Sequence, residues 1–117
     1  RVLALGRNRV ETTGDPTAHA EMVAIREAVA AGMSLRDATL YVTMEPCPMC
    51  AGAIVLARIP RVVFGCDDPK AGAVRSLYTL LSDSRLNHRC RVTGGVQAGT
   101  CAGILTRFFE ERRNRPA

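Results

Sequence analysis

The stretch Thr39-Leu40-Tyr41-Val42-Thr43-Met44-Glu45-Pro46-Cys47-Pro48-Met49-Cys50 holds a strand followed by the start of a helix. Its first five residues are β-branched, aromatic or aliphatic, which is typical of a strand. A helix is then expected to begin at Cys47 or Pro48, because proline is tolerated in the first helical turn. Pro60 ends this helix, and residues 61–66 form a second expected strand with a continuous apolar centre.

The same alternation extends to both ends of the chain. Strands are expected at residues 1–5, 39–43, 61–66 and 89–93, and helices at residues 16–31, 47–59, 77–81 and 100–113. This order predicts a three-layer α/β fold, with parallel pairing because the links can hold helical crossovers. The length of 117 residues favours one domain over residues 1–117.

Composition narrows the possible functions only a little. The net charge is +5, and Lys70 is the only lysine among 16 positive residues, so the rest are arginines. Arginine suits phosphate and can stack on bases, which weakly favours a nucleic-acid partner. No apolar run reaches the length of a membrane span, so none is expected. Five cysteines, an odd number, argue against a disulfide framework.

Two short motifs supply metal ligands at the starts of two helices. Cys47 and Cys50 lie one helical turn apart, and His19 directly precedes the pair Ala20-Glu21. Positive potential at a helix N-terminus is expected to lower thiol pKa values and favour thiolates. Both helices follow loops at one sheet edge, so the three ligands can meet over one zinc ion. Three protein ligands leave a position for water, as in catalytic zinc sites, and Glu21 can act as a base.

Other interpretations of these motifs remain at this point. Cys47 and Cys50 could be a redox pair. They could also hold a structural zinc ion with His19 and a fourth ligand, either Cys90 or His88.

His19-Ala20-Glu21 followed by Pro46-Cys47 and Cys50 matches the signature H-x-E…P-C-x-x-C of zinc-dependent nucleobase deaminases. In such enzymes zinc activates a water molecule, which attacks the ring carbon that bears the amine. A glutamate transfers the protons and helps ammonia to leave.

The flanking sequence resembles the bacterial tRNA-specific adenosine deaminases over nearly the whole chain. The segments that carry the resemblance are residues 8–21, 39–53, 58–65, 68–70, 86–89 and 108–113. It implies one zinc ion per chain on His19, Cys47 and Cys50, with Glu21 as the proton shuttle. It also implies that a zinc-dependent enzyme hydrolyses adenosine to inosine at the wobble position of a tRNA anticodon loop.

The resemblance further implies substrate contacts, made by Asn8, Ala20, Asp68, Lys70, Phe109 and Arg112. Asn8 could instead satisfy its own turn, Phe109 could pack in the core, and Arg112 could belong to a solvated tail.

A three-layer α/β/α cytidine deaminase-like fold with a central mixed sheet is also implied. Family members carry a first helix and a complete first strand before the position of Arg1, so that helix and part of that strand are expected to be missing. The resemblance implies a cytoplasmic homodimer that binds a tRNA anticodon stem-loop and no membrane. Two rivals are a non-catalytic RNA-binding zinc module and a free nucleobase deaminase, such as a guanine deaminase.

Overall fold

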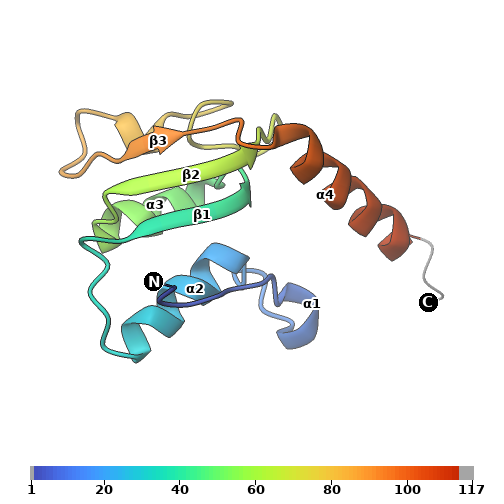
Figure 1. Cartoon of the computed structure of the whole chain (residues 1–117), viewed down its shortest axis with the longest axis horizontal. Coiled ribbons are helices and arrows are strands. Elements are labelled where there is room, and N and C mark those ends of the chain that lie inside the picture. Colours follow the sequence, from blue (N-terminus) through green and yellow to red (C-terminus); the bar gives the residue numbers. More distant parts are fainter. Residues whose placement is uncertain (1, 114–117) are drawn as a thin grey trace.

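The computed structural model describes the backbone of residues 2–113, and the side chains of these residues except Thr106 and residues 108–113. A parallel sheet of three strands lies at its centre, in the order β1 (Thr39–Met44), β2 (Arg61–Cys66) and β3 (Arg91–Thr93) (Figure 1). None of the helices in the described part of the chain combines the length and apolar character needed to cross a membrane.

The helices are α1 (Val10–Thr13), α2 (Ala20–Ala30), α3 (Pro48–Ala57) and α4 (Ala98–Arg113), with a short 3-10 helix η1 (Leu80–Ser82). In Figure 1, α3 lies behind the sheet, and α2 lies beyond β1. The first turn of α4 meets the other face, where a Cβ added at Gly65 would overlap Cys101. α3, the sheet and the first turn of α4 thus form three layers, and the rest of α4 extends away from the sheet (Figure 1).

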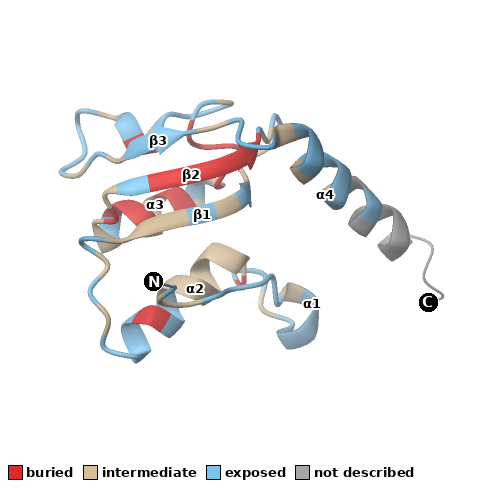
Figure 2. Cartoon of the chain, in the orientation of Figure 1, coloured by how far each residue is buried: buried red, intermediate tan, exposed pale blue. Residues whose placement is uncertain are grey.

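The core lies between α3 and the sheet face that it covers. Ile54 and Val55 of α3 pack with Val62 and Phe64 of β2, and Leu81 of η1 closes the cluster. Figure 2 shows this buried zone on β2 and α3. Burial on both faces explains why β2 is a continuous apolar run. The core therefore holds α3, and with it the cysteine pair, firmly against the sheet.

The structure confirms the α/β class, the three layers and the strands that begin at Thr39 and Arg61. The later elements are also present: η1 stands where a short helix was expected, β3 is shorter than expected, and α4 begins at Ala98.

Two expectations about the N-terminal part are wrong. Residues 2–5 form no strand, so within the described chain the sheet is parallel rather than mixed. The helix expected at residue 16 begins at Ala20, because Asp15 holds a turn in which its Oδ1 accepts hydrogen bonds from the backbone N–H and the hydroxyl of Thr17.

A cavity of about 890 Å³ separates residues 2–6 from β1. Its walls are this N-terminal segment, α2 and the outer edge of β1. Gly6 rests on α2 so closely that a Cβ there would overlap the backbone of Ala20 and Ala24. The N-terminal segment thus packs on a helix, which explains why it does not pair with β1.

Candidate metal centre

Three predicted ligands meet where two helices begin. His19 is the N-cap of α2 and Cys47 is the N-cap of α3, both with extended backbone. Cys50 follows Cys47 by one turn of α3 and is fully buried. Pro48 fixes the first turn of α3 and so sets the direction in which both cysteines point.

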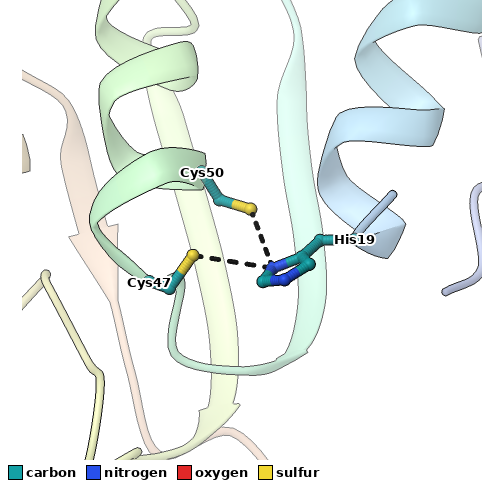
Figure 3. A group of neighbouring side chains, drawn as sticks. All are labelled: His19, Cys47 and Cys50. Atoms are coloured by element: carbon teal, nitrogen blue, oxygen red, sulfur yellow. Dashed lines mark hydrogen bonds between the residues drawn. The ribbon is translucent and has the colours of Figure 1, made fainter. Parts of the chain in front are cut away.

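The spacing of the three ligand atoms fits a tetrahedral zinc ion. Nδ1 of His19 lies 3.5 Å from Sγ of Cys47 and 3.6 Å from Sγ of Cys50 (Figure 3). Zinc bonds of about 2.3 Å to sulfur and about 2.0–2.1 Å to nitrogen, at the tetrahedral angle, give a separation of about 3.5 Å. Within the described residues this is the group of three or more metal-ligating side chains that lies close enough to hold an ion.

The protonation of Cys50 differs from the expectation for a helix N-terminus. Burial raises the pKa of the Cys50 thiol, and the charges of Glu21 and Cys47 raise it further. The expected lowering of the pKa at a helix N-terminus is therefore not found for Cys50 in the metal-free chain, where burial of the thiol is the largest effect. A bound dication is needed to turn Cys50 into a thiolate ligand.

Glu21 stands beside the ligand group without belonging to it. It lies in the first turn of α2, is half-buried, and lines the large cavity together with Ala20. Its charge acts on Cys50, which places the two side chains close together. A carboxylate in this position can exchange protons with a molecule bound at the ligand group.

Among the described side chains, neither candidate for a fourth protein ligand joins the group. Nε2 of His88 lies 2.8 Å from the carbonyl oxygen of Ile59, and Sγ of Cys90 donates a hydrogen bond to the same oxygen at 3.1 Å. Neither belongs to the group that His19 forms with the two cysteines. Three ligands with a neighbouring carboxylate correspond to a catalytic rather than a structural zinc site.

The sequence profile of the MafB19-like deaminases matches residues 1–113 of this chain. The chain belongs to the MafB19-like deaminase family. The ligand geometry is thus that of a deaminase, and the redox interpretation of the cysteine pair loses its basis.

Curated relatives of this deaminase carry a more specific name. The tRNA-specific adenosine deaminase of Streptococcus pyogenes serotype M1 is 48% identical over 97% of this chain and 68% of its own length. That of Bacillus subtilis strain 168 is 48% identical over 97% of this chain and 72% of its own. A solved structure, from a study of A-to-I editing by tRNA deaminases at the wobble position, superposes with a TM-score of 0.81. It is 43% identical and covers 89% of this chain and 77% of that one.

Of the residues predicted to contact the substrate, Ala20 directly follows His19 and lines the large cavity. Oδ1 of Asn8 accepts a hydrogen bond from the backbone N–H of Val10 at 2.9 Å, so it does satisfy its own turn. Oδ1 of Asp68 accepts the backbone N–H of Lys70 at 3.1 Å, and Lys70 itself is exposed. The side chains of Phe109 and Arg112 lie outside the described residues.

Glu45 is a residue that the sequence interpretation missed. It is 3% exposed, and burial alone would raise its pKa. Hydrogen bonds from the backbone of Arg75 and from Ser76 and Asp68 outweigh burial and hold the pKa of its carboxyl at about 2. Its place between an apolar strand and Pro46 could have indicated this role, because a carboxylate buried there needs hydrogen-bond partners.

Proposed function

We propose that this deaminase hydrolyses adenosine to inosine at the wobble position of a tRNA anticodon loop, as one zinc-dependent domain over residues 1–117. The observation that carries the proposal is the meeting of His19, Cys47 and Cys50 beside a carboxylate that is not a ligand. The names of relatives at 48% identity point to the same substrate.

His19, Cys47 and Cys50 would hold one zinc ion, which when bound supplies positive charge and lowers the pKa of a water molecule. Glu21 would take a proton from that water and deliver it to a ring nitrogen of adenine. As the oxygen of that water bonds to the ring carbon that bears the amine, Glu21 would take the second proton of the same oxygen and pass it to the amine. The bond from carbon to the amine nitrogen then breaks, a C=O bond remains and ammonia leaves. The adenine has to leave its stack to reach this site, which a single-stranded loop makes easier.

The substrate contacts remain part of the proposal. Asn8, Ala20, Asp68, Lys70, Phe109 and Arg112 would surround the flipped nucleotide and its neighbours. The position of Ala20 and Glu21 in one cavity wall supports this for Ala20. We further propose a cytoplasmic homodimer, for which light scattering should give twice the chain mass of 12.6 kDa.

The test compares three substrates with one protein sample of known zinc content. We expect inosine and ammonia from an anticodon stem-loop, and little product from free adenosine or free guanine. Activity on guanine alone would make the chain a free nucleobase deaminase. Bound zinc without ammonia from any substrate would make it a non-catalytic RNA-binding module.

A further inference from the structure

The carboxylate of Glu45 holds both ends of the loop that follows β2. Its Oε1 accepts the backbone N–H of Asp68 at 3.0 Å and the hydroxyl of Ser76. Its Oε2 accepts the backbone N–H groups of Val74, Arg75 and Ser76 at 3.0, 2.8 and 2.9 Å. One buried side chain therefore closes the segment from residue 68 to residue 76 into a ring.

The same carboxylate belongs to the chain that enters the metal-ligand helix. Only Pro46 separates Glu45 from Cys47, and the carbonyl of Pro46 accepts the backbone N–H of Ala73 at 2.8 Å. The loop is thus fastened to the two residues that lead directly into the first ligand on α3. Lys70 lies between the two points where Glu45 holds this loop, and it is exposed.

The fit around the carboxylate leaves no space for another group. A Cβ added at Gly72 would overlap the carboxyl group of Glu45, and Gly72 is buried. The glycine allows the loop backbone to lie directly on the carboxylate. The loop therefore has one position relative to α3, and that position depends on Glu45 and Gly72 together.

We propose that Glu45 is a positioning residue for the RNA substrate: it fixes the loop that carries Asp68 and Lys70 relative to the helix that carries Cys47. This inference rests on the proposed function, because it assigns the loop to RNA contact. Glu45 acts through the loop and touches neither the metal ligands nor the substrate. Its loss should weaken substrate binding more than it slows the chemical step.

The variant Glu45→Gln should remove the hydrogen bond to Asp68 and keep those to residues 74–76. Three backbone N–H groups point at Oε2, so the amide oxygen of the variant should stay there. The amide nitrogen then faces the N–H of Asp68, and two donors cannot form a hydrogen bond. We expect KM for an anticodon stem-loop to rise about tenfold, with kcat within about twofold and zinc content unchanged, because lost uniform binding appears in KM.

Two further variants keep the test decisive. Gly72→Ala should raise KM in the same way, because its methyl group displaces the carboxylate. Asp83→Asn is the matched control, since it changes another carboxylate that accepts a loop N–H, from Arg85 at 2.9 Å, away from the metal ligands. We expect its KM to equal that of the unaltered protein.

Hydrogen exchange gives a readout that does not depend on turnover. In Glu45→Gln the amide of Asp68 should exchange at least tenfold faster, while that of Cys90, bonded to Leu81, keeps its rate. An unchanged KM in both variants would overturn the inference, and so would zinc and kcat falling together at constant KM, which is the mark of a merely structural role. If the unaltered protein formed no inosine from the stem-loop, the proposed function would fail and the inference with it.

Discussion

Glu21 lies beside the ligand group but is not a metal ligand, so a substitution of Glu21 tests catalysis without removing a ligand. Replacing Glu21 by Gln keeps the size of the side chain and abolishes its basicity. We expect single-turnover inosine formation on an anticodon stem-loop to fall by about 10²-fold or more, since general acid–base catalysis typically contributes that much. Zinc measured on the same sample should stay near one ion per chain.

Glu27→Gln is the matched control for this variant. Glu27 lies in the same helix, is exposed, and sits more than one turn from the ligand group. Its replacement should leave both the rate and the zinc content unchanged. A Glu21→Gln protein that kept more than about a tenth of the rate with full zinc would exclude Glu21 as the shuttle.

The roles of single residues were predictable from the sequence where a short motif brings the reacting groups together by its spacing alone. The spacing of Cys47 and Cys50 on one helical turn, and the pair His19 and Glu21, were sufficient to predict a group that the structure brings together. The role of Glu45 was not predictable, because its hydrogen-bond donors lie in a distant loop whose path depends on tertiary packing.

A zinc ion would join the starts of α2 and α3, two elements that otherwise share few contacts. Replacing Cys47 by Ser should therefore remove the zinc and also lower the thermal stability. Binding of a ligand at about a hundred times its Kd stabilises a protein by about 2.7 kcal/mol. For a chain of this size we expect Tm to fall by about 10 °C, measured by calorimetry with zinc present.

The same substitution at another cysteine separates this effect from the change in side chain. Cys101 is partly buried on α4 and lies outside the ligand group. Cys101→Ser should keep its zinc, and a chelator should lower its Tm as much as that of the unaltered protein. A Cys47→Ser protein that still held stoichiometric zinc would contradict the ligand assignment.

The positions of helices and strands were predictable where a long apolar segment can be buried in only one kind of element. β2 is buried on both faces, and α3 ends at Ala57, two residues before the end expected from Pro60, so both were located closely. Residues 2–5 have a strand-like sequence, but their alternation does not decide which surface they meet. In the structure this segment packs against α2 at Gly6 and is irregular, instead of pairing with β1 as a strand.

The stability of the whole fold should fall in acid because of one buried carboxyl. The pKa of Glu45 is about 2 in the folded protein against an ordinary 4.5, so the unfolded chain takes up the proton first. Its contribution, about 3 kcal/mol at most, is complete above pH 4.5 and is lost as the pH falls towards 2. Urea unfolding of the metal-free protein across this range should show the loss.

Glu45→Gln should flatten this part of the pH profile, whereas Glu27→Gln should leave it in place. The experiment needs metal-free protein, because acid also protonates the metal ligands and would release bound zinc. An identical slope in Glu45→Gln and the unaltered protein would show that other groups cause the loss.

The net charge of +5 should make RNA binding by the whole molecule depend on salt. Contacts between arginines and phosphates release counterions, so the affinity falls as the salt concentration rises. Replacing Arg112 by Ala should weaken stem-loop binding irrespective of sequence and reduce the slope of log K against log salt by about one. Filter binding at several salt concentrations measures both quantities.

Arg85 provides the comparison, since its side chain is exposed and paired with Asp83 at 2.7 Å. Arg85→Ala should change neither the affinity nor the slope. Equal results for the two variants would assign Arg112 to a solvated tail.

The parallel topology also predicts the order in which parts of the chain fold. Cys47 and Cys50 belong to the β1–α3–β2 unit, whose connection is shorter than the one from β2 to β3. Shorter connections cost less entropy to close, so we expect this unit to form first and α2 to dock later with His19. Zinc added during refolding should then accelerate the late docking phase, seen by stopped-flow, and leave the initial collapse unchanged.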